Sequence, residues 1–124
     1  MAETPLLSVC IPIWNDEEFV AEALSSVLNQ TYKNLEVIFS DNASDDRSVE
    51  IIRSFKDPRV KIYSNEKNMG GLYNFLKVMG YATGKYMTYL SADDKVDTSA
   101  YEKAIHILED EKNQDIVLVN SHIE

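Results

Sequence analysis

Two adjacent carboxylates, Asp93 and Asp94, are the side chains with the clearest potential for chemistry. They lie in the segment Ser91-Ala92-Asp93-Asp94, directly after an apolar, strand-like run at residues 86–90. Paired carboxylates at the tip of a buried strand are unfavourable unless a positive charge lies beside them. Mg²⁺ and Mn²⁺ bind such hard oxygen ligands together with phosphate oxygens. The pair therefore predicts a divalent cation carrying a diphosphate, although a plain strand-to-loop exit would have the same residues.

An alternation of strand and helix patterns is expected to position this pair. Apolar runs indicate strands, and apolar residues at helical spacing indicate helices between them. The strands are expected at 7–13, 35–40, 60–63, 86–90 and 116–119, and the helices at 17–28, 49–55, 72–79 and 101–108. This order predicts an α/β fold with a mainly parallel sheet and helices on both faces. In such sheets ligands bind beyond the carboxyl ends of the strands, where polar loops follow the first four strands.

Composition and charge exclude several classes of protein. The 124 residues, 44% hydrophobic and 27% charged, fit a single globular domain expected to span residues 1–124. The net charge of −9 argues against nucleic-acid binding, which needs a basic face. The single cysteine, Cys10, lies in an apolar run and is expected in the core. Without a membrane-spanning run or a signal-peptide pattern, the sequence predicts a cytoplasmic location and leaves docking on the inner face of the membrane open.

Five segments together resemble the family 2 glycosyltransferases. They are SVCIPIWNDE (8–17), SVLNQTY (26–32), EVIFSDNASDD (36–46), NMG (68–70) and GKYMTYLSADD (84–94). Each segment has moderate specificity, but their order and spacing are typical of that family. The resemblance implies a Rossmann-like GT-A fold, of which this chain is the nucleotide-sugar-binding half.

The resemblance also implies roles for residues after the first two strands. Asp41 matches an aspartate that accepts a hydrogen bond from the imide N–H of uracil, with shaping of its own turn as the alternative. Trp14, beside Pro12, is expected to stack on the base, or else to be a core or interface residue. Asn15 either contacts the nucleotide or caps the first helix. Glu17 either holds the nucleotide loop or favours the start of the helix.

The third and fourth loops complete the implied site. Asn68 and Gly70 open the third helix, where backbone N–H groups can face a diphosphate, although the glycines could equally form a plain turn. Relatives often have arginine in the following turn, which is missing here. Many relatives also have aspartate at the position of Ser91, so Ser91 is left to contact ribose. Asp93 is expected to bind Mn²⁺ or Mg²⁺ directly, and Asp94 to orient the loop or a metal-bound water.

The implied function is metal-dependent, inverting transfer of a sugar from a nucleoside diphosphate sugar, with UDP as the expected nucleotide. The acceptor would be a glycan or lipid-linked molecule in cell-surface polysaccharide synthesis. The catalytic base is expected beyond this chain, which is expected to end before the acceptor-binding part. A non-catalytic nucleotide-binding or interaction module is the alternative, and a receiver-like signalling domain is a weaker one. Apolar residues 116–119 are expected to be exposed and to favour a homodimer.

Overall fold

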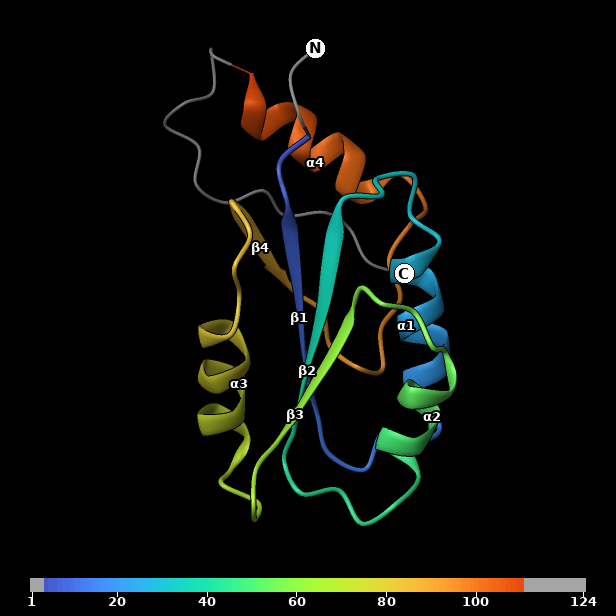
Figure 1. Ribbon diagram of the computed structural model, residues 1–124, viewed down its shortest axis with the longest axis vertical. Coiled ribbons are helices and arrows are strands. Elements are labelled where there is room, and N and C mark those ends of the chain that lie inside the picture. The colour runs from blue at the N-terminus through green and yellow to red at the C-terminus, as the bar shows by residue number, and fades with distance from the viewer. Residues whose placement is uncertain (1–3, 111–124) are drawn as a thin grey trace.

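A computed structural model describes residues 4–110, which form a four-stranded parallel sheet flanked by four helices (Figure 1). The strands lie in the order β3-β2-β1-β4. Their bounds are β1 Leu7–Ile13, β2 Leu35–Asp41, β3 Val60–Ser64 and β4 Tyr86–Tyr89. The helices between and after them are α1 Val20–Leu28, α2 Ser48–Ser54, α3 Gly71–Gly80 and α4 Ala100–Glu109. Because all four strands run parallel, their carboxyl ends meet at one edge of the sheet.

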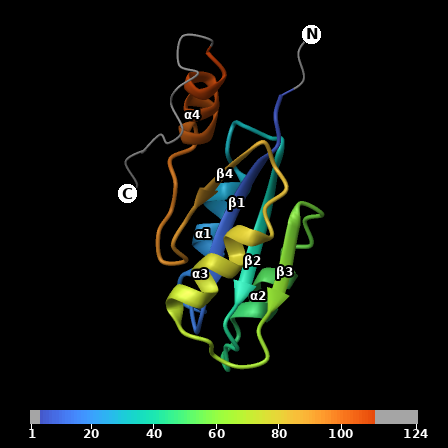
Figure 2. The same cartoon turned by 90° about the vertical axis from the view of Figure 1, so that its left-hand side faces the viewer.

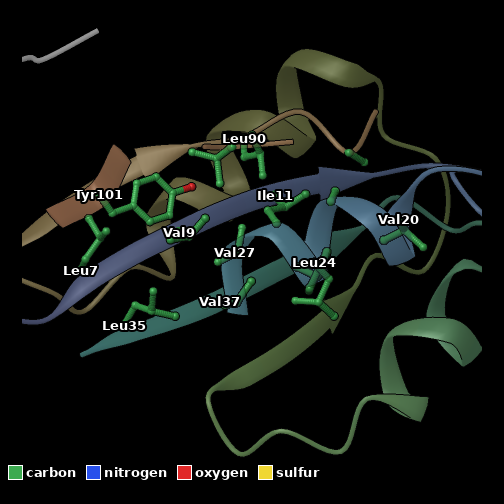
Figure 3. Close-up of a cluster of buried hydrophobic side chains, with 14 of the residues drawn as sticks. Leu7, Val9, Ile11, Val20, Leu24, Val27, Leu35, Val37, Leu90 and Tyr101 are labelled. Atoms are coloured by element: carbon green, nitrogen blue, oxygen red, sulfur yellow. The ribbon is translucent and has the colours of Figure 1, made fainter. Parts of the chain in front are cut away.

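The main core lies on the face of the sheet covered by α1, α2 and α4. Alternate residues of β1 and β2 point into it, and Figure 3 shows Val9, Ile11 and Val37 packed against Leu24 and other apolar residues of α1. The buried side chains of this core have less than a tenth of their surface exposed. This large apolar contact fixes β1 and β2 as a rigid base for the loops that follow them.

Among the described elements, only α3 covers the opposite face, as the two views show (Figures 1 and 2). Within residues 4–110, the fully buried members of the apolar cluster beneath it are Cys10, Ile38 and Val78. Burial, with a smaller contribution from Glu36, raises the pKa of Cys10 to about 11, so the thiolate is disfavoured at neutral pH. The expectation that Cys10 is a core residue is confirmed.

A buried carboxylate joins the strands near their amino ends. Glu36 accepts hydrogen bonds from Ser8 Oγ at 2.5 Å, Lys61 Nζ at 2.7 Å, Thr83 Oγ1 at 2.8 Å and Thr83 N at 2.9 Å. Gly84 N donates in turn to Ser8 Oγ at 2.8 Å. These bonds tie β1, β2 and β3 to the segment that enters β4.

The predicted strand and helix order is confirmed within the described residues. One boundary differs: α1 begins at Val20, so Glu17 precedes the helix, whereas β1 spans Leu7–Ile13 as expected. The fifth predicted strand, 116–119, lies outside the described residues, as does the apolar surface expected there. The receiver-like alternative is wrong, since such domains place β3 beside β1, whereas here β4 lies there. None of the helices within residues 4–110 has the length and apolarity needed to cross a membrane.

Candidate nucleotide-binding site

The loops after β1 and β2 are joined by five hydrogen bonds at the carboxyl edge of the sheet. Asn15 exchanges two of them: its N–H donates to Ser44 Oγ at 2.8 Å, and its Oδ1 accepts from Asp45 N at 3.0 Å. Glu17 exchanges two more, donating to Asp46 Oδ2 at 3.1 Å and accepting from Arg47 N at 3.2 Å. The fifth bond joins the Asp16 N–H and Ser48 Oγ. The two loops therefore hold one another in place.

These contacts bear on the structural alternatives posed for Asn15 and Glu17, while their contact with a nucleotide remains a prediction. Asn15 does not cap the first helix, because the residue at the N-cap of α1 is Phe19. The acidic residue in the first turn of α1 is Glu22, so Glu17 acts on the loop instead of the helix start. Asn15 also adopts a left-handed backbone conformation with φ of 51°. Non-glycine residues adopt that conformation rarely, and often at functional sites.

Trp14 projects from the end of β1 with 51% of its surface exposed. The expectation that it could be a core residue is wrong for that reason. Its backbone N–H donates to Asp16 Oδ2 at 2.9 Å, which fixes the backbone while the indole stays accessible. Pro12, half-buried in the same strand, precedes it by two residues. Stacking of Trp14 on a base remains a prediction.

Asp41 ends β2 and is almost fully buried, with 5% of its surface exposed. Its Oδ1 accepts a hydrogen bond from Ser44 N at 3.2 Å, so the side chain does shape its own turn. The turn includes Ala43 in the left-handed conformation with φ of 64°. An ionised carboxylate has about four acceptor positions, so this one bond leaves capacity for a ligand N–H.

A network of asparagine side chains holds the loop between β3 and α3. Asn42 Oδ1 accepts from Met69 N at 2.8 Å and from Asn65 Nδ2 at 3.0 Å, while its Nδ2 donates to Asn68 Oδ1 at 2.9 Å. Asn74 Oδ1 accepts from the same Asn65 Nδ2 at 3.0 Å. Asn42 and Asn74 are each 3% exposed. This loop is therefore anchored to the end of β2 by fully paired buried amides.

Glycine is needed at one of the two positions that open α3. Gly70 has φ of 90°, a conformation that side chains disfavour, and its N–H donates to Asn68 Oδ1 at 2.8 Å. Gly71 begins the helix and has no atom within 4 Å of the position a Cβ would take. The turn alternative thus fits Gly70, while Gly71 is a helical residue with open space where a side chain would lie.

The loop after β4 presents Asp93 and Asp94 to solvent. Ser91 Oγ donates to Asp93 Oδ1 at 2.6 Å, and Asp94 N donates to the Ser91 carbonyl at 3.0 Å. Ser91 therefore orients the carboxylate of Asp93 through its hydroxyl. Its contact with ribose remains a prediction.

Negative charge accumulates between this loop and the loop after β1. Burial raises the pKa of Asp16, and the nearby carboxylates of Asp93 and Asp46 raise it further, against the opposing hydrogen bond from the Trp14 N–H. Such mutual repulsion is what a bound cation would relieve. Among residues 4–110, no group of three or more histidine, cysteine or acidic side chains is close enough to hold a metal by itself.

The donor chemistry of the pair nevertheless fits Mg²⁺ or Mn²⁺. These ions commonly take only one or two carboxylates and complete their coordination with water and phosphate oxygens. Asp93 and Asp94 supply exposed, hard oxygen donors of that kind. They fit a cation that arrives with a diphosphate better than a site built wholly from protein ligands.

A solvent-open hollow of about 480 Å³ lies at the other end of the sheet, near the start of β2. It is lined by Thr4, Thr31, Tyr32, Lys33, Asn34 and Glu102. None of the predicted site residues lines it. Its lining offers one hydrogen-bonded acid, Glu102, which accepts from Thr31 Oγ1 at 2.6 Å. The carboxyl edge therefore remains the better candidate on chemical grounds.

Three residues with clear structural roles were not singled out in the sequence. Asn42 and Asn74 look like loop and helix-surface residues, and their inward positions depend on how α3 packs over β2. Asp16 is one acid among several in its segment, yet its carboxylate is close enough to Asp93 across two loops to be repelled by it. The parallel order of β1 and β4 could have indicated that approach.

Comparison with known proteins assigns the chain to a family. The family model described as Glycosyl transferase family 2 matches residues 8–123. An uncharacterized glycosyltransferase of Haemophilus influenzae is 36% identical over 126 residues, covering 100% of this chain and 38% of the relative. UDP-Glc:alpha-D-GlcNAc-diphosphoundecaprenol beta-1,3-glucosyltransferase WfaP of Escherichia coli is 36% identical over 110 residues, covering 86% of this chain and 43% of the relative. The chain thus spans less than half the length of these relatives.

Solved structures with the same fold include two nucleotide complexes. TarS 1–349 of S. aureus in complex with UDP has a TM-score of 0.80 and 23% identity, and covers 86% of this chain and 32% of its own. The mannosyltransferase PcManGT of Pyrobaculum calidifontis, in complex with GDP-Man and Mn²⁺, has a TM-score of 0.78 and 22% identity, and covers 89% of this chain and 34% of its own. The predicted GT-A nucleotide-binding half is confirmed as the fold.

Proposed function

Because the chain belongs to the family 2 glycosyltransferases, we propose that it is the part of an inverting, metal-dependent transferase that binds a nucleoside diphosphate sugar. UDP is the proposed nucleotide, and a glycan or lipid-linked molecule of cell-surface polysaccharide synthesis is the proposed acceptor. The observation that carries this proposal is the meeting of Asp41, Asp93 and the asparagine-held loop at one edge of a parallel sheet. Ligands of open α/β sheets bind at that edge.

The relatives support the finer parts of this proposal. The name of WfaP specifies a UDP-linked glucose donor and a diphosphoundecaprenol-linked acceptor. The structure of TarS contains UDP, and that of PcManGT contains GDP-Man and Mn²⁺. Since the two structures differ in the nucleotide base, the choice of uracil rests on Asp41.

Each proposed contact follows from the position of a side chain. Asp93, held by Ser91, binds the cation, and Asp94 orients the loop or a metal-bound water. The cation would stabilise the negative charge that develops on the diphosphate as the glycosidic bond breaks. Asp41 accepts a hydrogen bond from the imide N–H of the base, and the exposed indole of Trp14 stacks on the ring of the base. The absence of a side chain at Gly71, and of other atoms where one would lie, would let the diphosphate approach the backbone at the start of α3.

We place the catalytic base outside residues 4–110. The acidic side chain that ends α4, Glu109, is held by Lys85 Nζ at 2.7 Å and by the Tyr86 hydroxyl. A carboxylate committed to such an ion pair is a weak proton acceptor. Sugar transfer to a defined acceptor by this chain alone would contradict this part of the proposal.

Calorimetric titration with UDP and GDP, each with and without Mn²⁺, tests the nucleotide site. UDP is expected to bind only weakly without Mn²⁺, and Asp93→Asn to weaken the Mn²⁺-dependent binding by about tenfold or more. Asp97→Asn is the matched control, because it removes the same charge from an exposed position in the same loop. Asp41→Asn is expected to reduce the preference for UDP over GDP. Equal affinities for Asp93→Asn and the unsubstituted chain would refute the metal site.

A non-catalytic nucleotide-binding module is the second candidate. Ser91 favours it, because a hydroxyl directed at Asp93 replaces a carboxylate expected in many relatives. One measurement separates the two candidates: the release of UDP from a UDP-sugar by a longer form of the chain, assayed in the presence of an acceptor. Turnover that is lost in Asp93→Asn supports the transferase, whereas nucleotide binding without turnover supports the module.

A further inference from the structure

Asn42 is a buried amide whose side chain makes four hydrogen bonds to one loop. Its Oδ1 accepts from Met69 N at 2.8 Å and from Asn65 Nδ2 at 3.0 Å. Its Nδ2 donates to Asn68 Oδ1 at 2.9 Å and to the Gly70 carbonyl at 3.2 Å. A side-chain amide has two donors and two acceptor positions, so these bonds use its full capacity. Neither a carboxylate nor an apolar side chain of the same size could make all four.

The middle of this loop depends on Asn42 for its attachment to the end of β2. Among the hydrogen bonds of residues 4–110, those that Asn68 and Met69 make outside their own loop all go to Asn42. Both residues are exposed, so burial of their side chains contributes little to holding them. The position of this part of the loop therefore follows the Asn42 side chain.

Asp41, the residue directly before Asn42, is held in a different way. It ends β2 and lies opposite Ile13 of β1 and Ser64 of β3 in the sheet register. Its carbonyl accepts a hydrogen bond from Asn65 N at 2.8 Å, and the Asn42 N–H donates to the Ile13 carbonyl at 2.9 Å. These contacts are made by the backbone, so they do not need the Asn42 side chain. Loss of that side chain is expected to displace the loop while Asp41 stays in place.

The backbone N–H groups of the loop are used by the protein itself. Those of Met69 and Gly70 donate to the side chains of Asn42 and Asn68. Within this segment, a diphosphate is therefore left with the first N–H groups of α3, which begins at Gly71 and whose early N–H groups have no acceptor within the helix. Because Gly70 and Gly71 are adjacent in the chain, the loop sets the position of these donors.

We propose that Asn42 is a positioning residue that fixes the separation between the base contact and the diphosphate contact of the nucleotide site. This inference rests on the proposed function, in which Asp41 receives the base and the start of α3 receives the diphosphate. Asn42 follows Asp41 in the chain and holds the loop that leads into α3, so one side chain joins the two contacts. A nucleoside diphosphate then meets both contacts already in place, whereas a nucleoside gains nothing from the fixed loop.

NMR titrations of the isotope-labelled 124-residue chain with uridine and with UDP, both in the presence of Mg²⁺, test this role. Asn42→Ala is expected to lower the affinity for UDP by about tenfold or more and to change the affinity for uridine by less than about twofold. In this variant the amide signals of Gly71 and Leu72 should respond less to UDP. The signal of Asp41 should keep its response to both ligands, which a general loosening of the fold would not preserve.

Two further variants guard against a loss that reflects stability alone. Gln30→Ala is the matched control, because it removes another fully buried amide, whose bonds to Ser26, Asp97 and Tyr101 lie outside the candidate site. It is expected to lower the stability and to leave the ratio of the UDP and uridine affinities unchanged. Asn42→Ser is uncharged and keeps one hydroxyl, so it carries the test if Asn42→Ala does not fold.

The ratio of the two affinities decides the outcome. A folded Asn42 variant with the same ratio as the unsubstituted chain overturns the inference, whether both affinities fall together or neither changes. An equal fall of the ratio in Gln30→Ala overturns it as well. Failure of the proposed function differs from these results, because the unsubstituted chain would then bind neither ligand, or would bind UDP no better than uridine, and the inference would fail with it.

Discussion

At the amino end of the sheet, Glu36 is enclosed by four hydrogen bonds, whereas at the carboxyl end Asp93 and Asp94 face solvent. Burial alone would raise the pKa of Glu36, but the hydrogen bonds from Lys61, Ser8 and Thr83 lower it to about 2. The pKa of Asp16 moves the opposite way, through burial and the repulsion of Asp93 and Asp46. The protein thus stabilises the negative charge of Glu36 with hydrogen bonds, whereas the repulsion between Asp16 and its acidic neighbours is not relieved.

The difference separates a structural carboxylate from candidate ligand-binding ones. A buried charge that supports the fold needs its hydrogen bonds supplied by the protein itself. A carboxylate that awaits a cation must keep its oxygens accessible, and the repulsion among such groups persists until the cation binds. The amino end is therefore expected to govern stability, and the carboxyl end to govern ligand binding.

The largest effect on stability is expected from Glu36→Ala. It removes a buried acceptor and leaves Ser8 and Thr83 without their partner, which should lower the free energy of unfolding by about 3 kcal/mol. Urea denaturation at neutral pH measures the loss, with Asp45→Ala at the exposed carboxyl end as the comparison. Equal stabilities of the two variants would remove the distinction between the two ends.

A smaller loss is expected where the chain passes closely beneath the Glu36 network. A Cβ on Gly84 would lie 2.5 Å from the Leu6 carbonyl oxygen, whereas one on Gly71 would meet nothing within 4 Å. Gly84→Ala should therefore cost about 2 kcal/mol through backbone displacement, and Gly71→Ala should be nearly neutral. Thermal denaturation of the two variants measures these losses of stability. A larger loss for Gly71→Ala than for Gly84→Ala would contradict the expected asymmetry.

The two ends should also differ in the sign of their pH dependence. The pKa of Glu36 falls from 4.5 to about 2 on folding, so the unfolded state binds more protons in that interval. Its stabilising contribution is present above pH 4.5 and is lost as the pH falls toward 2, by at most about 1.4 kcal/mol per pH unit. Asp16 has a raised pKa, so its contribution opposes stability once the pH rises above its ordinary value of 3.8. Urea midpoints of the unsubstituted chain and of Glu36→Gln across this range test the sign for Glu36. If the loss of stability below pH 4.5 is the same in both proteins, the assignment to Glu36 is wrong.

The smallest effect on stability is expected from Asp93→Asn. Removing this charge relieves the repulsion at Asp16, so stability should rise by a few tenths of a kcal/mol, while the pKa of Asp16 should fall. Carboxyl chemical shifts recorded by NMR during a pH titration report the pKa directly. An unaltered Asp16 titration would show that the two carboxylates do not interact.

Much of the fold followed from local pattern in the sequence. The buried runs at 7–13 and 35–40 became β1 and β2, because an apolar stretch of that length between polar turns has few alternatives in an α/β chain. The helical spacing of Leu72, Phe75, Leu76 and Met79 predicted α3 as well. The spacing did not reveal that Asn74 points inward, because its partners are Ser40 of β2 and Asn65, the residue directly after β3.

The candidate site was predicted less completely than the fold. Asp41, Asn68, Gly70, Ser91 and Asp93 came from family-like motifs, and the structure places them at one edge of the sheet. The contacts of Asn15 and Glu17 with the loop after β2 depend on two loops meeting in space. The approach of Asp16 to Asp93 is of the same kind, since residues so far apart in the chain interact only through the strand order.

The asparagine network around Asn42 has a consequence for how the site responds to its surroundings. Amide side chains neither gain nor lose protons in water, so the anchorage of Asn68 and Gly70 is insensitive to acidity. The scaffold that would receive the pyrophosphate keeps its shape while neighbouring carboxylates change charge. Any acid-dependent change in ligand affinity would consequently come from the aspartates and the ligand itself, because the conformation of this loop does not depend on pH.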